Sequence, residues 1–175
     1  MPAPLEAARI EDAAAIAALL TTVAEGLTRQ YGTGHWSHAS TKKAVLSGMK
    51  RSRVYVARND AGIVATLTLA TKKPWAIDRR YFSDVKRPLC LLGMAVGPGQ
   101  RGGGIGKQCI FAAKVICREW PADALFLDAY DDAAGAGEFY RKWVHGGWTG
   151  NLPEHPADLF RHAGVSAVHR GTATG

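Results

Sequence analysis

The sequence has few cysteines and no long apolar run, and both absences narrow the class of protein. Its three cysteines, Cys90, Cys109 and Cys117, are an odd number without the spacing of a disulfide framework or a thiolate metal site. No stretch approaches the ~20 apolar residues that span a bilayer, and the N-terminus lacks the basic and apolar regions of a signal peptide. We therefore expect a cytoplasmic protein that has no membrane partner.

The sequence also lacks internal repeats, a linker and the known nucleic-acid-binding motifs. With 175 residues and 47% hydrophobic composition, one domain over residues 1–175 can bury a core. The net charge of +7 is compatible with nucleic acid, with polyanionic small molecules or with solubility alone. Without a motif, we do not expect nucleic acid as the partner. Residues 71–88 carry six cationic and two acidic side chains among aromatics, and we interpret them as a connecting loop.

Apolar periodicity predicts two helices and a hairpin in the first half of the chain. Asp12 can cap a first helix, and Gly32 can end it. Thr41 can cap a shorter second helix. Strands over 54–57 and 63–69, joined by a turn with Asn and Gly, form the hairpin. The apolar stripe of the first helix consists of Ile16, Leu19, Leu20, Val23, Leu27 and Tyr31, and that of the second consists of Val45, Leu46 and Met49.

In the second half of the chain, the pattern of apolar residues and glycines predicts a strand, a turn and a helix in direct succession. Residues 89–96 form a continuous apolar run, typical of a central strand covered on both faces. A glycine-dense turn follows, and then an amphipathic helix that ends before Pro121. The remaining expected elements are a strand over 124–130, a short helix over 138–144, and weak strands over 148–152 and 165–169.

The glycine-dense turn has the arrangement of an anion site. Glycine lets a backbone approach a ligand closely, and the N–H groups of a helix N-terminus point at that ligand. A P-loop is excluded, because it needs glycine and a hydroxyl residue where Arg101 and Gln108 stand. Residues 97–102 match the dinucleotide-binding spacing, but Pro98 removes a donor there. The third spacing is R-x-x-G-x-G over residues 101–106.

This R-x-x-G-x-G turn and the order of elements resemble the GCN5-related N-acetyltransferase (GNAT) family over essentially the whole chain. The resemblance implies an α/β GNAT fold, with a mixed central sheet of about six to seven strands and about four flanking helices. It also implies acetyl-CoA as donor, its pyrophosphate on backbone N–H groups and its pantetheine paired with the preceding strand. The residues so implied in cofactor binding are Met94, Ala95, Val96, Arg101, Gly102, Gly103, Gly104, Ile105, Gly106 and Lys107.

Residues 138–142 resemble the F-Y-x-K helix of the family, whose tyrosine lies near the coenzyme sulfur. The resemblance implies Tyr140 as the general acid, and a main-chain N–H at Ala95 as the donor that polarises the thioester carbonyl. The chain departs from the family in three places. Asp131 and Asp132 stand where an asparagine is usual, the segment after residue 142 is altered, and Gly93 offers no carboxylate. The candidates for the general base are Asp128, Asp131, Glu25 and His35.

The sequence His35-Trp36-Ser37-His38 suggests either a metal site or an acceptor site. Two histidines three residues apart leave too many metal ligands missing, so we predict no metal. The resemblance places this loop beside the acceptor pocket. The implied substrate contacts are His35, Trp36 and His38, together with Trp75 and Tyr81 from the basic loop.

Together these patterns predict an N-acetyltransferase that moves an acetyl group from acetyl-CoA to a primary amine by direct attack. The acceptor class stays open among small-molecule amines, antibiotics, protein amines and aminoacyl-tRNA, and a homodimer is compatible with the sequence. One alternative is a non-catalytic sensor that binds acyl-CoA. A second is an RNA-binding protein that uses the loop over residues 72–87.

Overall fold

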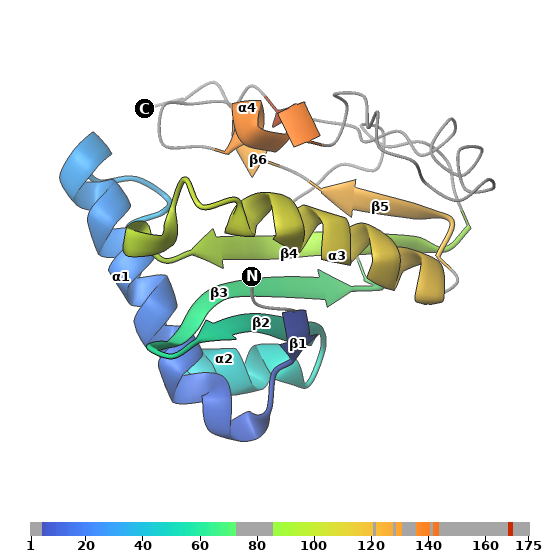
Figure 1. The fold of residues 1–175 in the computed structure, drawn as a ribbon, viewed down its shortest axis with the longest axis horizontal. Coiled ribbons are helices and arrows are strands. Elements are labelled where there is room, and N and C mark those ends of the chain that lie inside the picture. The colour runs from blue at the N-terminus through green and yellow to red at the C-terminus, as the bar shows by residue number, and fades with distance from the viewer. Residues whose placement is uncertain are drawn as a thin grey trace. The chain divides into compact units, whose positions relative to one another are not determined.

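The computed structural model describes residues 5–72, 86–120, 122–127, 129–130, 136–140, 142–143 and 168–169. Its elements follow the predicted order (Figure 1). They form two compact units, one of Met1–Ala70 with Gly93–Ala112 and one of Thr71–Leu92 with Ala113–Gly175. The elements are β1 (Leu5–Ala7), η1 (Ile10–Asp12), α1 (Ala13–Tyr31), α2 (Lys42–Met49), β2 (Arg53–Asn59), β3 (Gly62–Ala70), β4 (Pro88–Val96), η3 (Pro98–Gln100), α3 (Ile105–Glu119), β5 (Ala124–Leu127), β6 (Ala129–Tyr130), α4 (Gly137–Tyr140) and β7 (Val168–His169).

The main sheet has five strands in the order β1-β2-β3-β4-β5. β1, β2 and β3 pair antiparallel, whereas β4 and β5 pair parallel, so the sheet is mixed. β6 and β7 pair in parallel in a separate two-stranded sheet. The α/β class is confirmed. The expected single sheet of six to seven strands is corrected to five strands plus this small second sheet in the part of the chain that is described.

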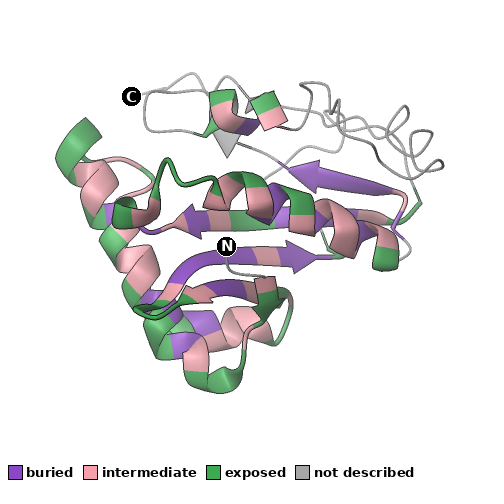
Figure 2. Cartoon of the chain, viewed as in Figure 1, coloured by how far each residue is buried: buried purple, intermediate pink, exposed green. Residues whose placement is uncertain are grey.

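The β2–β3 hairpin is confirmed, and its turn has the predicted chemistry. Asn59 pairs with Gly62, and the Asn59 Oδ1 atom accepts a hydrogen bond of 2.9 Å from the Ala61 N–H. Gly62 has a φ of 110°, a conformation that favours glycine. β3 is largely buried (Figure 2), with four consecutive buried residues at its centre.

Helices cover both faces of the first unit's strands. On one face, Val54 and Val56 of β2 pack in a cluster with Ile16 of α1 and Val45 of α2. Ala57, the next residue of β2, packs instead with Cys109 of α3. Successive side chains of a strand point to opposite faces, so α1 and α2 cover one face and α3 covers the other (Figure 1).

The predicted stripe of α1 is only partly right. Ile16 is buried, but Val23 and Leu27 are half-buried and Tyr31 is 41% exposed. The other buried residues of α1 are alanines at positions 13, 17 and 24, which let the helix approach its neighbours closely. The second helix agrees better with prediction, because the Thr41 hydroxyl accepts a hydrogen bond of 3.1 Å from the Ala44 N–H as its cap.

The three cysteines are buried thiols. Burial raises the pKa of Cys109 to about 11, and burial together with the Asp123 charge raises the pKa of Cys117 to about 11. Both side chains therefore stay protonated near neutral pH and behave as small apolar residues of α3. Within the residues described here, no helix combines the length and the apolar character needed to cross a bilayer.

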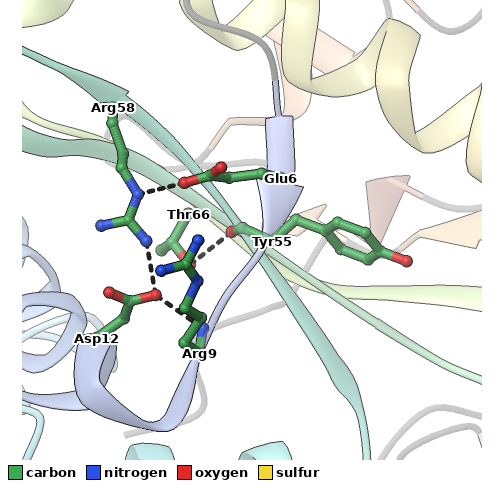
Figure 3. A network of polar contacts seen from close by, with 6 residues as sticks. All are labelled: Glu6, Arg9, Asp12, Tyr55, Arg58 and Thr66. Carbon is green, nitrogen blue, oxygen red and sulfur yellow. Dashed lines mark hydrogen bonds and ion pairs between the residues drawn. The ribbon is translucent and has the colours of Figure 1, made fainter.

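Asp12 has a different role from the helix cap that its position suggests. It stands just before α1, yet its carboxylate makes no capping bond to that helix. Its Oδ2 atom instead accepts hydrogen bonds from the Arg9 N–H at 2.7 Å and from Arg58 Nη2 at 2.6 Å (Figure 3). Arg58 also pairs through Nε with Glu6. Arg58 of β2 therefore ties β1 and the start of α1 together.

We expect Asp12→Asn to destabilise the fold by about 1 kcal/mol at pH 7 and by little at pH 2. The hydrogen bond from Arg58, with smaller contributions from Arg9, lowers the pKa of Asp12 below its ordinary value of 3.8. A lowered carboxylate pKa stabilises the folded state above the unfolded pKa, and the contribution is lost as pH falls through the folded pKa. Urea denaturation of both proteins at the two pH values measures this difference.

The matched control is Asp60→Asn, which makes the same change in the exposed hairpin turn. It should leave stability unchanged at both pH values. An Asp12→Asn effect of equal size at pH 7 and pH 2 would contradict an ionic role for the contact with Arg58.

Candidate active site

The glycine turn is anchored where it leaves β4. The buried Gly97 donates a 2.9 Å hydrogen bond from its N–H to the Val64 carbonyl of β3. A Cβ at Gly97 would lie 3.4 Å from Leu19 Cδ1 and 3.5 Å from that carbonyl oxygen. Gly97 therefore lies against both α1 and β3. Pro98 begins the short helix η3 immediately after it.

Beyond η3, the backbone takes a conformation that requires glycine at two positions. Gly102 and Gly104 both have a φ of 83°, in the left-handed region that residues with a Cβ rarely adopt. Gly103 lies between them without a positive φ, and all three residues are exposed. The glycines at 102 and 104 are thus needed for the path of the chain itself.

This turn and the first turn of α3 present a row of unused N–H groups. The first hydrogen bond of α3 runs from the Gln108 N–H to the Gly104 carbonyl at 3.1 Å. The amides of Gly102 through Gly106 have no acceptor within the described part of the chain. Unused amides at a helix N-terminus carry partial positive charge and bind anions.

The charges around these amides favour an anion further. α3 has 15 residues and no acidic side chain in its first turn, so no carboxylate of its own competes for the amides. Arg101 and Lys107 are both exposed on either side of the glycines. Of the predicted phosphate-binding residues 101–107, all but the half-buried Ile105 and Gly106 are exposed, and the two cations flank the glycines.

β4 is less uniformly buried than its apolar sequence predicts. Leu89 to Leu91 are buried, but Leu92 is 42% exposed and Gly93 is exposed as well. β5 pairs with β4 from Pro88 to Leu91, and among the described residues the pairing ends there. The expectation of a strand covered on both faces along its whole length is therefore wrong.

The last residues of β4 face the core of the first unit. Met94 and Val96 are half-buried and pack against the cluster of Val64, Ala65 and Cys109. Ala95, between them, is buried. The segment predicted to meet pantetheine thus has side chains that pack within the first unit.

Tyr140 ends α4, in the second compact unit. Its side chain is 7% exposed, its N–H donates to the Ala136 carbonyl at 2.9 Å, and its ring lies edge-on to Phe139. α4 spans Gly137–Tyr140, and Lys142 and Trp143 beyond it are in π-helical conformation, whereas positions 141 and 144 of the predicted helix over 138–144 lie outside the described residues. Lys114 of α3, which the sequence patterns did not single out, donates from Nζ to the Trp143 carbonyl at 3.1 Å.

The loop after α1 is held by hydrogen bonds that fix Trp36. Its indole Nε1 donates to the Gly32 carbonyl at 3.0 Å, and its ring occupies the space that a Cβ at Gly34 would need. Ser37 accepts hydrogen bonds from the Thr28 hydroxyl at 2.7 Å and from the Gly34 N–H at 2.9 Å. The loop is therefore ordered by α1.

The structure describes some of the residues predicted to contact the acceptor or to act as the base, and not others. His35 is exposed and packs edge-on against the half-buried Trp36, with 4.7 Å between the ring centroids. His38 and Glu25 are exposed. The predicted residues Trp75, Tyr81, Asp128 and Asp131 lie outside the described residues.

Comparison with known families identifies the fold. The model of the acetyltransferase (GNAT) family matches residues 20–145, which include the C-terminal part of α1, the hairpin, β4, the glycine turn, α3 and α4. The chain belongs to the GNAT family. Acetyl-CoA is the acetyl donor of this GNAT protein, as of its family.

Solved structures agree with the family at the level of the fold. A tetramutant of the BH1408 protein from Bacillus halodurans is 21% identical, covers 87% of this chain and 98% of its own, and has a TM-score of 0.59. A GCN5-related N-acetyltransferase from Rhodopseudomonas palustris is 20% identical over 81% of this chain and 80% of its own, with a TM-score of 0.59. A GNAT acetyltransferase from Brucella melitensis in complex with acetyl-CoA is 18% identical over 79% of both chains, with a TM-score of 0.56. No curated protein matches this chain.

Proposed function

We propose that residues 1–175 form one GNAT domain that transfers the acetyl group of acetyl-CoA to a primary amine by direct attack. The observation that carries the proposal is the row of unused amides from Gly102 to Gly106 between two exposed cations. Acetyl-CoA bound to the similar fold from Brucella melitensis supports it. The three buried thiols are compatible with a reducing compartment, and we place the protein in the cytoplasm.

In this proposal the donor is held by backbone groups. The pyrophosphate accepts hydrogen bonds from the amides of residues 102–106, and Arg101 and Lys107 add positive charge. The amides of pantetheine pair with the backbone of Met94 and Val96, in the way that an added strand pairs with a sheet edge. Backbone donors in a fixed loop bind phosphate without ordering long side chains.

The transfer forms a C–N bond and breaks the thioester C–S bond, and it needs three groups. The Ala95 N–H polarises the thioester carbonyl, and donors of this kind are worth about 3–4 kcal/mol where they have been tested. Tyr140 gives its proton to the departing thiolate of coenzyme A. The proton lost by the amine goes to a base. Glu25 and His35 are the exposed candidates on the described loop and helix, acting through water.

A coenzyme A release assay with a thiol reagent tests the proposed function against the sensor alternative. The assay uses the full chain, acetyl-CoA and a panel of small amines, amino acids, polyamines and lysine peptides. Amine-dependent, saturable release together with an acetylated amine in the mass spectrum is the expected result. Saturable acetyl-CoA binding without turnover on any amine would instead support the sensor, for which Gly93 leaves β4 without a carboxylate.

We expect Trp36→Ala to raise the KM for the acceptor about tenfold while leaving acetyl-CoA binding unchanged. The indole is fixed by its bond to Gly32, so its loss removes a preformed wall of the loop rather than a mobile side chain. Steady-state kinetics on any amine that turns over, with acetyl-CoA titrated separately, measure both quantities. Ile10→Ala, a change of an exposed apolar residue before α1, is the control. An unchanged acceptor KM would remove Trp36 from the acceptor site.

A further inference from the structure

Residues 26–59 are strongly basic. This segment contains seven lysines and arginines and no aspartate or glutamate. The rest of the chain contains 15 lysines and arginines and 15 acidic residues, so its net charge is zero, although residues 71–88 within it are also basic. Cations without acidic neighbours along the chain give this segment a positive potential of its own.

Five of the seven cations form one exposed surface around α2. Arg58 is paired with Glu6 and Asp12, and Arg29 lies near the end of α1. The others are on α2, in the turn that leads into β2, and at the first position of β2. We call the five the α2 basic face, and they are Lys42, Lys43, Lys50, Arg51 and Arg53, all exposed.

The geometry of α2 directs Lys43 and Lys50 away from the core. α2 buries Val45 against α1 and β2, with Leu46 and Met49 packed beside it. At 100° per residue, Lys43 and Lys50 lie on the same side of the helix, opposite Val45. Lys42, Lys43, Lys50 and Arg51 have no carboxylate partner within the described residues, and Arg51 donates only to the Ser47 hydroxyl at 3.2 Å.

The position of these charges is unfavourable for the isolated fold. Lys42 and Lys43 occupy the first turn of α2, which has no acidic residue, although the helix N-terminus carries partial positive charge. Like charges close together on one helix also repel. A bound anion would offset both the repulsion from the helix N-terminus and the repulsion between the lysines. Neither repulsion stabilises the folded state.

We propose that the α2 basic face binds the phosphodiester backbone of a nucleic-acid duplex. Phosphate contacts come from Lys, Arg, Ser and Thr side chains and from helix N-termini, and residues 41–53 contain all of these. Missing base-reading motifs do not oppose this proposal, because contacts to the backbone read no sequence.

The surface chemistry disfavours a protein partner. Protein interfaces have an apolar centre and are depleted in lysine. The exposed large apolar residues of the described chain are Ile10, Tyr31, Leu92 and Phe111, none of them within residues 41–53. The same absence of exposed aromatic rings leaves no platform for stacking single-stranded bases, so a duplex is the better fit.

The test compares two triple variants with the same change in net charge. One is Lys42→Gln/Lys43→Gln/Lys50→Gln, and the control is Lys72→Gln/Lys86→Gln/Lys142→Gln, at exposed positions outside the segment. Fluorescence anisotropy with labelled 20-base-pair RNA and DNA duplexes of one sequence measures binding by the full chain between 50 and 200 mM salt. The two duplexes distinguish which backbone is preferred.

We expect wild type to bind with an affinity that falls steeply with salt, with a slope of about −3 on a double-logarithmic plot. The α2 variant should bind at least tenfold more weakly, with a shallower slope, while the control variant changes less than threefold. The α2 variant should also melt at the same or a higher temperature, because unfavourable charges are removed. Loss of binding with retained stability cannot result from misfolding.

Three outcomes would overturn the proposal. Equal weakening in both variants means that net charge alone attracts the duplex. Weakening in the control variant alone assigns binding to one or more of Lys72, Lys86 and Lys142 instead of α2. No salt-dependent binding by wild type to either duplex excludes a phosphodiester partner. Acetyl-CoA titration of the α2 variant should give the wild-type affinity, which keeps this test separate from that of the proposed acetyl transfer.

Discussion

Gly104→Val should weaken acetyl-CoA binding about a hundredfold or more. Gly104 has a φ of 83°, which a β-branched residue adopts only at a cost of about 1–2 kcal/mol, so the turn must change its path. A changed path removes the row of amides from the positions in which they can bind the pyrophosphate together. Isothermal titration of acetyl-CoA into wild type and variant measures the change. Gly106→Val should weaken binding similarly, because it places a branched side chain within the proposed cradle.

Gly99→Ala is the matched control for this prediction. Gly99 lies in the same connection, has no positive φ, and a Cβ there would meet nothing within 4 Å. We expect wild-type affinity and a wild-type melting temperature. Wild-type acetyl-CoA binding by a folded Gly104→Val protein would contradict the assignment of the glycine turn to the donor.

Tyr140→Phe should lower kcat about a hundredfold and leave acetyl-CoA binding unchanged. General acid catalysis accelerates reactions about 10²–10⁴-fold. A thiol with a pKa of ~8.5 leaves readily as the thiolate, so we expect an effect at the lower end of that range. The side chain is buried beside Phe139, so phenylalanine fills the same space and removes only the hydroxyl. Steady-state kinetics and acetyl-CoA titration separate the two quantities.

Tyr55→Phe on β2 is the control, because it removes a hydroxyl from a half-buried tyrosine without a proposed role. It should have wild-type kcat. If Tyr140→Phe has wild-type kcat as well, another group or water protonates the thiolate. If it loses acetyl-CoA affinity instead, Tyr140 is part of the binding site rather than the acid.

The elements that the sequence predicts best are those determined by neighbouring residues. The hairpin depends on Asn59 and Gly62, and the second helix begins at the Thr41 cap, so short-range chemistry is sufficient for both. The glycine turn is of the same kind. Its glycine spacing predicts a backbone path, and Gly102 and Gly104 have the positive φ values that require glycine.

Features that depend on distant residues escape prediction. The position of Asp12 predicts a helix cap, but its carboxylate instead accepts a hydrogen bond from Arg58, which is 46 residues away in the sequence. The apolar run of β4 predicts a fully covered strand, yet Leu92 is exposed, because the coverage of a strand depends on elements distant in sequence. The proposed acceptor contacts also depend on distant residues. They lie on loops, and no local sequence pattern determines how a loop packs.

The most direct test of the central claim is an acetyl-CoA titration followed through the backbone amide signals of the 18.7 kDa protein by NMR. The account predicts that the amides of Gly102 to Gly106 shift most, downfield and to saturation, as they donate to the pyrophosphate, with Met94 and Val96 shifting alongside them. Saturable binding with these amides unmoved would contradict it, and would mean that the glycine turn does not hold the donor.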